Sequence, residues 1–379
     1  MKRVLILASV ASMIDQFNML NIKVLKDSNF IVEVACNFED GSTISNERIE
    51  KLKQKLTELN VKYHQIDFAR QVWNMSYNIK AFKQVNSLLN DNSYEFIHCH
   101  SPIGGVIGRL ASINKPTKVV YTAHGFHFFK GASKKSWLLY YPIEKVLSRY
   151  TDILITINQE DFNRAKNFSA RKLVYVPGIG IKTNNSSGVD KISLKNSLGI
   201  DINKKIVLSV GELSKRKNHE VIIKAIGELK SDNIIYLICG KGNLENHLIK
   251  IAADAKVNLK LLGYREDINE ILQIADIFVF PSLQEGLPVS LLEALEKDLA
   301  IVASNIRGNE DIIENGVNGL LFSKNDYLGF SQGISRLLEE SNSCYKKRVN
   351  NHNRNIIYEF SEENIYNELE KIYNDNVLK

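Results

Sequence analysis

Two glutamates, Glu285 and Glu293, stand on either side of a Gly286-Leu287-Pro288 turn that follows an apolar run. Carboxylates accept hydrogen bonds from neighbouring hydroxyl groups, so one could hold a sugar and the other a ribose. Pro288 suits the first turn of a helix, and the glycine lets a ligand approach the backbone. The free N–H groups at a helix start favour an anion such as a diphosphate. The alternative is a helix cap beside an exposed glutamate.

A second group of polar residues follows the apolar run Lys205–Val210. Gly211 permits a tight turn there, and Lys215, Arg216 and Lys217 come shortly after it. Cations placed against a departing diphosphate meet the main electrostatic demand of a group-transfer reaction. Without further context, three consecutive basic residues are also typical of a solvated turn.

Histidines gather in the first half of the chain. His124 lies in the segment Tyr121–Phe129, which follows a predicted strand. His127 is more typical of a partly buried aromatic neighbour. His98 and His100 flank a cysteine, but no third and fourth ligands stand at a spacing that would make a zinc site.

The elements that must position these residues are short β-rich runs alternating with stretches of helical period. Strands and helices in alternation predict parallel sheets with helices on both faces. Ligands of such sheets bind beyond the carboxyl ends of the strands, where these motifs stand. The predicted strands are Val4–Ala8, Phe30–Ala35, Phe96–Cys99, Lys118–Thr122, Asp152–Ile157, Leu173–Val176, Lys205–Val210, Ile234–Cys239, Leu259–Leu262, Ile277–Phe280 and Ala300–Ala303.

A loop-rich stretch from Pro177 to about Lys204 interrupts this rhythm, and we interpret it as a linker. With 379 residues the chain exceeds the usual size of one core. We therefore expect an α/β protein with two Rossmann-like domains facing each other across a cleft. The expected bounds are 1–180 for an acceptor-binding domain and 181–358 for a nucleotide-binding domain, with a final helix, 359–379, that could pack back on the first domain.

The composition, 44% hydrophobic and 24% charged, is that of a globular protein. Residues 1–180 carry 24 Lys and Arg against 15 Asp and Glu, so the first half is basic. A membrane surface, a lipid phosphate, nucleic acid or plain solvation could explain this charge, but no nucleic-acid-binding motif accompanies it. No apolar run is long enough to span a membrane, and the short apolar start fits a buried strand better than a signal peptide. We expect a cytoplasmic protein.

Basic and aromatic residues are interleaved between Phe129 and Tyr141. Such a mixture is typical of a segment that lies on an anionic membrane, here the inner face of the plasma membrane. A helix packed on the core with a basic edge is the alternative. The residues assigned to the membrane contact are Lys130, Lys134, Lys135 and Trp137.

The segment from Ala275 to Glu293, with its two glutamates and Gly-Leu-Pro turn, resembles the signature of the family 4 glycosyltransferases, whose two-domain fold is called GT-B. Other landmarks of that family occur in the expected order along nearly the whole chain. The resemblance implies Glu285, His124 and Lys217 as catalytic residues. It implies a donor site made of Gly211, Arg216, Lys217, Gly240, Gly242, Tyr264, Arg265, Glu285, Gly286, Leu287, Pro288 and Glu293.

Some of these assignments have simpler alternatives. Gly240 and Gly242 could form a tight connection between strand and helix. Glu212 stands where many relatives have arginine, which leaves Lys217 and backbone groups to bind the diphosphate. The first loop, Ser9–Asn18, lacks the Gly-Gly pair of many relatives; in the family it borders the acceptor, so Phe17 and Asn18 are assigned there.

Thr-Ala-His-Gly-Phe-His-Phe-Phe, residues 122–129, and Pro-Gly-Ile-Gly-Ile, residues 177–181, look like bacterial capsular or exopolysaccharide transferases of this family. The resemblance implies a retaining hexosyl- or N-acetylhexosaminyltransferase that uses a nucleotide-sugar, a UDP-sugar by preference, and a saccharide on a polyprenyl diphosphate. It implies no metal and no cofactor beyond the nucleotide-sugar co-substrate. A sugar-nucleotide epimerase of the same architecture and a non-catalytic nucleotide- or glycan-binding subunit are the alternatives.

Overall fold

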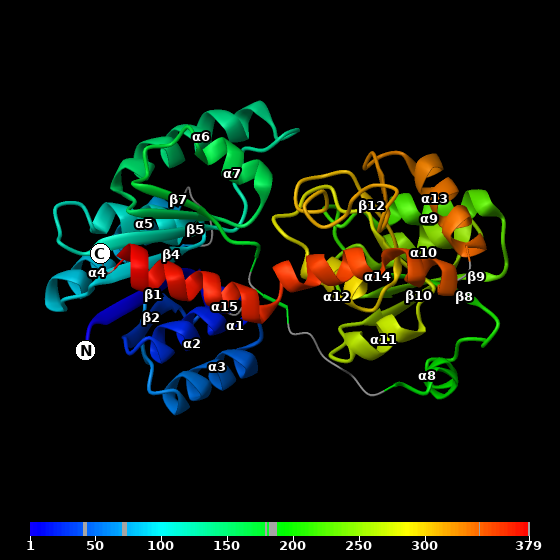
Figure 1. The fold of residues 1–379 in the computed structure, drawn as a ribbon, viewed down its shortest axis with the longest axis horizontal. Coiled ribbons are helices and arrows are strands. Elements are labelled where there is room, and N and C mark those ends of the chain that lie inside the picture. The colour runs from blue at the N-terminus through cyan, green and yellow to red at the C-terminus, as the bar shows by residue number, and fades with distance from the viewer. Residues whose placement is uncertain (41–43, 70–73, 179, 182–187, 341, 378–379) are drawn as a thin grey trace. The chain divides into compact units, whose positions relative to one another are not determined.

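The structure of the protein, a computed structural model, describes residues 1–40, 44–69, 74–178, 180–181, 188–340 and 342–377. The chain forms two compact units, Met1–Gly180 together with Glu362–Lys379, and Ile181–Ser361. Each unit is built on a parallel β-sheet covered by helices (Figure 1). The C-terminal helix belongs to the first unit and begins at Glu362, whereas the sequence placed the start of this segment at residue 359.

The first unit contains the strands β1 (Arg3–Val10), β2 (Ile31–Asn37), β3 (Lys62–Gln65), β4 (Phe96–His100), β5 (Lys118–Ala123), β6 (Ile153–Thr156) and β7 (Lys172–Tyr175). They pair in parallel in the order β3-β2-β1-β4-β5-β6-β7. The order reverses between β1 and β4, and this is where such sheets bind ligands. At this point the Oγ of Ser101, just after β4, accepts a hydrogen bond from the Ser9 N–H of β1 at 3.1 Å.

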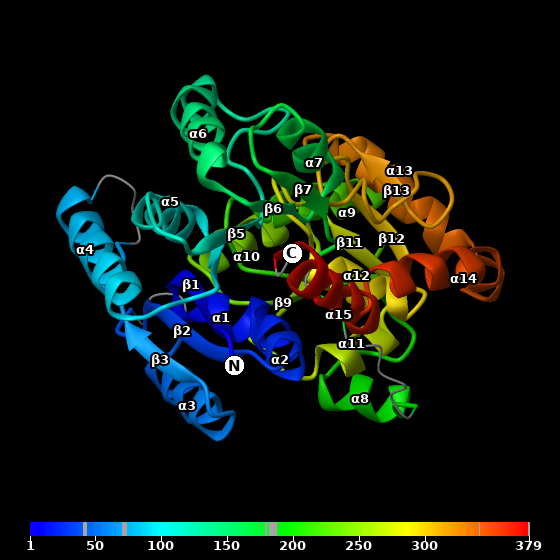
Figure 2. The same cartoon turned by 60° about the vertical axis from the view of Figure 1, so that its left-hand side comes forward.

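Helices cover both faces of this sheet, as Figure 2 shows from a second direction. One face carries α1 (Ala11–Phe17), α2 (Met19–Asp27), α3 (Asn46–Glu58), α15 (Glu362–Lys371) and the final π-helical turn η2 (Ile372–Val377). The other carries α4 (Met75–Asp91), α5 (Pro102–Ala111), α6 (Lys134–Leu147) and α7 (Gln159–Ala165), with a short 3-10 turn, η1 (Ser148–Tyr150), after α6.

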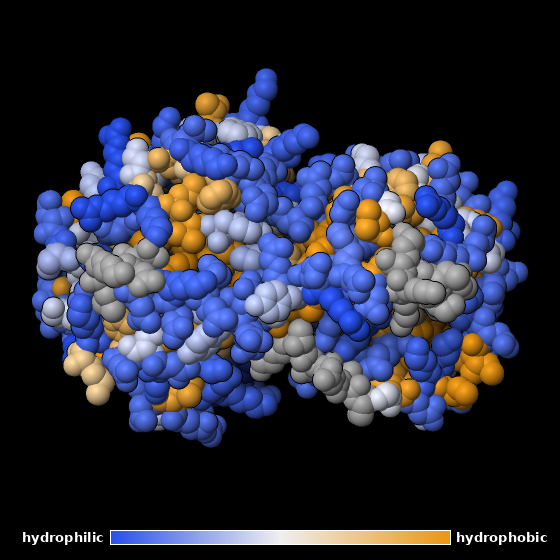
Figure 3. Space-filling view, in the orientation of Figure 1, coloured by the Kyte–Doolittle hydropathy of each residue, from blue (hydrophilic) through white to orange (hydrophobic). Residues whose placement is uncertain are grey.

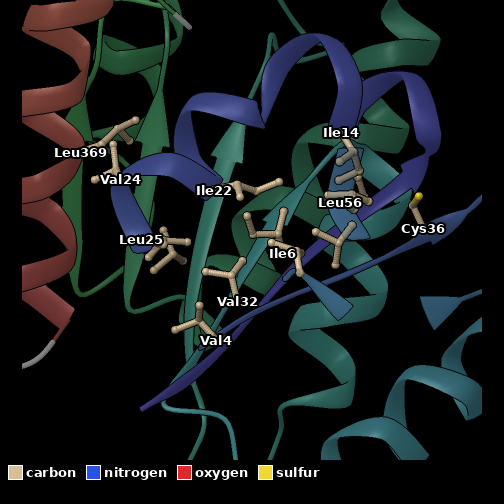
Figure 4. Close-up of a cluster of buried hydrophobic side chains, with 14 of the residues drawn as sticks. Val4, Ile6, Ile14, Ile22, Val24, Leu25, Val32, Cys36, Leu56 and Leu369 are labelled. Carbon is tan, nitrogen blue, oxygen red and sulfur yellow. The ribbon is translucent and has the colours of Figure 1, made fainter. Parts of the chain in front are cut away.

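The C-terminal segment completes the core of the first unit. Figure 4 shows Leu369 of α15 beside Val24 and Leu25 of α2, in the cluster that also contains Val4 and Ile6 of β1. Tyr373 is fully buried and stacks on Phe96 with ring centroids 5.6 Å apart. These contacts bury apolar surface contributed by the two ends of the chain, which stabilises the unit.

The second unit contains β8 (Lys205–Val210), β9 (Ile234–Cys239), β10 (Asn258–Gly263), β11 (Ile277–Phe280), β12 (Ala300–Ser304) and β13 (Leu320–Phe322), in the order β10-β9-β8-β11-β12-β13. One face packs on α8 (Lys191–Ser197), α11 (Ile268–Ile274) and α12 (Val289–Glu296). The other packs on α9 (His219–Leu229), α10 (Glu245–Asp254) and α13 (Tyr327–Glu339), while α14 (Asn342–Glu359) contributes to both.

Every predicted strand exists, and the bounds of β8, β9 and β11 agree with the prediction. The strands β3 and β13 were not predicted. The stretch interpreted as a linker contains α8, which is capped by Asp190: its carboxylate accepts from the N–H groups of Ile192 and Ser193. No helix in the described part of the chain is long and apolar enough to cross a bilayer.

Candidate active site

Most of the predicted donor residues follow β8 and β11, between which the strand order of the second sheet reverses. Several hydrogen bonds join the loop after β8 to the loop after β11. The N–H of Leu283 donates to the carbonyl of Arg216 at 2.8 Å, and the amide of Asn218 donates to the carbonyl of Pro281 at 3.1 Å. Residues far apart in the sequence therefore form one rigid turn at the carboxyl end of the sheet.

Glu285, Arg216 and Lys217 form a compact ion cluster in this turn. Oε1 of Glu285 lies 2.8 Å from Nζ of Lys217 and 2.8 Å from Nη1 of Arg216. Lys217 and Glu285 are 13% and 11% exposed, whereas Arg216 is 46% exposed. The two cations predicted to bind a diphosphate are thus paired with the predicted sugar-binding carboxylate.

Lys217 is held tightly from several sides. Its stem lies against Gly211, where an added Cβ would come within 3.1 Å of it, and its ammonium lies 4.7 Å from the centre of the Phe280 ring. Burial lowers the pKa of Lys217, and the Glu285 carboxylate opposes that shift. A partly desolvated ammonium in a fixed position attracts an anion more strongly than one in open solvent.

Glu293 lies on α12 in a different environment. It is half-buried and has no hydrogen-bond or ion-pair partner in the described part of the chain. Burial, and secondarily the Glu296 carboxylate, raises the pKa of Glu293. Pro288 stands at the N-cap position of α12 without a side-chain capping hydrogen bond, and the helix begins beside it, at Val289. The two acids therefore differ: Glu285 is paired with two cations, while burial keeps the pKa of Glu293 raised.

Gly240 and Gly242 support the site through the backbone. A Cβ on Gly240 would come within 1.9 Å of the Gly211 carbonyl oxygen, and one on Gly242 within 2.4 Å of that of Leu213. Only glycine permits this approach, since either Cβ would collide with backbone atoms. Both glycines hold the Gly211 turn in place, in agreement with the tight-connection alternative.

Tyr264 and Arg265 follow β10 at the edge of the sheet. Tyr264 is exposed, and the Arg265 guanidinium is bound to Asp267, with its Nε 2.7 Å from Oδ1. The Arg265 side chain therefore forms a local ion pair with Asp267.

Arg307 is a site residue that the sequence reasoning missed. It follows β12, is 6% exposed, and its Nε donates to the Glu285 carbonyl at 3.1 Å. The adjacent Gly308 packs on the Gly286 carbonyl, 2.6 Å from where its Cβ would stand. Arg307 thus fixes the turn that carries Glu285. The signal in the sequence was an arginine-glycine pair directly after a predicted strand.

In the first unit, His124 lies at the carboxyl end of β5. Its Nε2 is 3.0 Å from Nδ1 of His100, and the edge of the Phe17 ring packs against it with centroids 5.5 Å apart. These three side chains border a cavity of about 20 Å³, enough for one water molecule. Desolvation lowers the pKa of His124 to about 4, so the ring is neutral at pH 7.

Asn18 does not line an accessible surface. It is fully buried, and its amide donates to the Met13 carbonyl at 2.8 Å while its carbonyl accepts from Asn21 at 3.1 Å. It joins α1 to α2, so of the two residues assigned to the acceptor only Phe17 borders the cavity. His98 and His100 belong to no group of metal-binding side chains among the described residues.

The predicted membrane segment forms α6 and the turn before it, and Trp137 differs from the prediction. Its ring packs inward on Phe128, with centroids 5.7 Å apart, and beneath the guanidinium of Arg164 at 4.6 Å. Lys134 and Lys135 are exposed, as is Lys130, whose backbone N–H donates to Glu160. The outward apolar residues are instead Leu138 and Leu139, together with Val146, Tyr150 and, on α5, Leu110.

We define the α6 surface as Lys134, Lys135, Leu138, Leu139, Lys145, Val146, Arg149 and Tyr150. None of its four cations is ion-paired within the described residues, and the acid of α6, Glu144, is buried against Arg109 at 2.8 Å. Figure 3 shows hydrophobic surface among hydrophilic residues in the part of the first unit where Figure 1 draws α5 and α6. The buried ion pair anchors the helix, and the outer face combines positive charge with exposed apolar side chains.

Solved structures of other proteins share the fold. The chain matches Anabaena Alr3699/HepE, solved in complex with UDP-glucose, over 98% of this chain and 99% of that one, with a TM-score of 0.77 and 17% identity. WaaG, a glycosyltransferase involved in lipopolysaccharide biosynthesis, matches with a TM-score of 0.70 and 14% identity over 98% and 100% of the two chains. The two Rossmann-like units are those of a GT-B fold, which confirms the predicted fold class.

Sequence relatives show the family. Residues 190–357 match the glycosyl transferases group 1, and residues 3–158 match a glycosyl transferase 4-like domain. EpsD of Bacillus subtilis, whose glycosyltransferase activity is itself inferred, is 35% identical over 308 residues, 78% of this chain and 80% of that protein. The UDP-Gal:α-D-GlcNAc-diphosphoundecaprenol α-1,3-galactosyltransferase of Escherichia coli is 32% identical over 295 residues, 73% and 76% of the two chains. The chain belongs to the group 1 glycosyl transferase family and is a glycosyltransferase.

Proposed function

We propose that the protein is a retaining glycosyltransferase that moves a hexosyl or N-acetylhexosaminyl group from a UDP-sugar to a saccharide linked to polyprenyl diphosphate, in capsular or exopolysaccharide synthesis. The names of relatives support the substrates: the E. coli enzyme uses UDP-Gal and a diphosphoundecaprenol-linked sugar, and HepE was solved with UDP-glucose. The observation that carries the proposal is the Glu285–Arg216–Lys217 cluster at the reversal point of the second sheet.

The cluster suggests how the reaction proceeds. The donor diphosphate binds Arg216 and Lys217 in place of the Glu285 carboxylate, which is thereby released to hold hydroxyl groups of the sugar. The bond between the anomeric carbon and the diphosphate oxygen breaks, and the acceptor oxygen bonds to the same face of that carbon. The acceptor proton passes to the departing diphosphate, so the cations stabilise the developing negative charge. No metal or cofactor takes part in this scheme.

Thermal unfolding with a panel of UDP-, GDP- and ADP-sugars tests the donor. We expect UDP and UDP-sugars to raise the melting temperature, because a ligand that binds the native state stabilises it, and the other nucleotides to have little effect. A transfer assay then combines each stabilising UDP-sugar with polyprenyl-diphosphate-linked GlcNAc. Conversion of the UDP-sugar in the absence of any acceptor would instead indicate an epimerase, and binding of nucleotide without either reaction would indicate a binding subunit.

The acceptor is carried by a lipid, so we propose that the protein works in the cytoplasm, bound peripherally to the inner face of the plasma membrane. The α6 surface supports this contact. Leu138 is 78% exposed, and the lysines and arginine beside it complement the negative headgroups of an anionic leaflet. The lipid tail of the acceptor would remain in that leaflet while its saccharide reaches the protein.

The substitution Leu138→Glu is expected to weaken binding to vesicles rich in phosphatidylglycerol about tenfold or more. The substitution removes roughly 2 kcal/mol gained by burying the leucine side chain in the bilayer. It also adds a negative charge, which the anionic headgroups repel. Neutralising Lys134 and Lys135 together costs about 2 kcal/mol at low salt, and this loss should fade at high salt because of screening. Vesicle co-sedimentation measures both effects.

The matched control is Ile192→Glu, which changes a 61% exposed apolar residue on α8 of the second unit. It should leave vesicle binding unchanged. Equal loss in both variants, or none in either, would remove the α6 surface from the proposal.

A further inference from the structure

A chain of polar groups in the second unit joins the strands β8, β9 and β11 to the turn that follows β8. Oγ of Ser209 lies 2.8 Å from the carbonyl oxygen of Val279, and the Tyr236 hydroxyl lies 3.0 Å from that Oγ. Nδ1 of His219 is 3.1 Å from the hydroxyl of Tyr236, and its Nε2 is 3.3 Å from the carbonyl oxygen of Glu212. The three side chains are buried, so their hydrogen bonds depend on the protons that they carry themselves.

The chain has a carbonyl group at each end, and a carbonyl can only accept a hydrogen bond. Its four contacts therefore need four protons. The two hydroxyl groups and a neutral imidazole supply three. One contact then brings two acceptors together, whichever way the hydroxyls turn and whichever ring nitrogen is protonated. An imidazolium supplies the fourth proton, so the geometry of the chain favours His219 with both nitrogens protonated.

Burial opposes that fourth proton in the ligand-free protein. Desolvation, aided by the positive charge of Lys217, lowers the pKa of His219 to about 4, although the Glu212 carbonyl opposes the shift. The Glu212 carboxylate itself is exposed. Charged groups on the helices around His219 have partners of their own, namely Glu220 with Lys224 and His247, and Asp326 with the N–H of Gly329. His219 is therefore neutral at pH 7 until another charge comes close to it.

The chain ends at the donor site described above. His219 lies two residues after Lys217, and the Glu212 carbonyl that it faces belongs to the same turn as Gly211, on which the Lys217 stem packs. A diphosphate bound to Lys217 and Arg216 brings two negative charges to this turn. Negative charge near an imidazole stabilises its protonated form, and a partly desolvated surrounding strengthens the effect.

We propose that His219 is a proton-accepting positioning residue of the donor site: when the diphosphate of a nucleotide-sugar binds, the imidazole takes up one proton from solvent and completes the hydrogen-bond chain to the Glu212 carbonyl. No covalent bond other than the new N–H changes. The imidazolium holds the turn of Gly211 and Glu212 and adds a positive charge only while the anion is bound. The coupling rests on the proposed function, which supplies the diphosphate.

Calorimetry with UDP-glucose at pH 5.5, in two buffers of different ionisation enthalpy, measures the protons taken up on binding. UDP-glucose is the probe because neither of its phosphates titrates in this range, whereas a terminal phosphate does. We expect uptake of about half a proton per ligand, and a Kd that falls about three- to fivefold from pH 8 to pH 5. The sign follows because anion binding raises the pKa of His219, so binding tightens as the pH falls.

Two variants remove the coupling in different ways. His219→Gln has no group that takes up the proton. Tyr236→Phe removes one contact of the chain, so a neutral His219 that donates to Glu212 leaves no contact without a proton. Both variants should lose the part of the uptake that belongs to His219; uptake that remains belongs to carboxylates of the site. His247→Gln, which changes a half-exposed histidine of α10, is the matched control and should keep the wild-type uptake.

Ring ¹⁵N NMR of the full-length protein, labelled at histidine, observes the proton directly at pH 5.5. The His219 signals are identified by their loss in His219→Gln or, should that variant fail to fold, by their shift in Tyr236→Phe. We expect a neutral ring in the free protein and a shift of both nitrogens toward imidazolium values with saturating UDP-glucose. A ring that stays neutral in the complex would overturn the proposal, as would equal proton uptake by the wild type and His219→Gln.

The coupling and the proposed function fail in different ways. A protein that binds UDP-glucose and transfers sugar, but takes up no proton at His219, would refute the coupling and leave the function intact. A protein that binds UDP-glucose at no pH would refute the use of this donor and the coupling together.

Discussion

Replacing Glu285 with alanine is expected to abolish sugar transfer while strengthening the binding of UDP. In the ligand-free protein the Glu285 carboxylate occupies both Lys217 and Arg216, each at 2.8 Å. Its removal leaves two unpaired cations, so a diphosphate no longer competes with an internal anion. We expect a gain of about 1 kcal/mol, or five- to tenfold in Kd, by calorimetry at low salt. Transfer should fall by two to three orders of magnitude, because the sugar loses its charged acceptor.

The control is Glu228→Ala, which removes one negative charge from an exposed position of α9 without touching the cluster. It should change neither UDP binding nor transfer. The opposite result for Glu285→Ala, weaker UDP binding, would mean that Glu285 organises the cations for the ligand and does not compete with it.

Replacing Lys217 with methionine is expected to lower both UDP affinity and kcat/KM about 100-fold. Methionine keeps most of the stem that packs on Gly211 and the Phe280 ring, so the change removes mainly the charge. Glu285 retains Arg216 as a partner, and the site then has no net positive charge to offer a diphosphate. The melting temperature should stay close to that of the wild type. Folding of the wild type costs free energy because the Lys217 ammonium is desolvated, and methionine removes this cost.

Lys215→Met is the matched control, since Lys215 lies exposed in the same loop. Calorimetry with UDP and steady-state transfer kinetics should place it close to the wild type. Should both lysine variants lose affinity equally, the general charge of the loop would bind the nucleotide, and the specific position of Lys217 would not matter.

The sequence predicted the strands that have continuous apolar runs. Parallel strands have such runs because helices cover both faces of their sheet. The two that it missed lie at the edges of their sheets. β3 reads Lys-Tyr-His-Gln and is only partly buried, and β13 has three residues. An edge strand is covered less completely, so its sequence carries little hydrophobic signal.

The position of the candidate site was also predictable, since motifs after β8 and β11 must meet at one end of a parallel sheet. The pairing of Glu285 with Lys217 was not, because it depends on how side chains point across two loops that are remote in sequence. Trp137 shows the same limit. Its type favours a membrane interface, but its position on α6 turns it toward Phe128, and only the packing of the helix reveals which face is buried.

The polypeptide enters the second unit at Ile181 and returns to the first at Glu362. The ribosome therefore synthesises the whole of the second unit before it makes Leu369 and Tyr373, which fill the interior of the first. Until that segment is made, Phe96 and His98 of the first unit lack their contacts with Tyr373. The unit that is begun first is thus completed after the second one, whereas domains generally fold from the N-terminal end during synthesis.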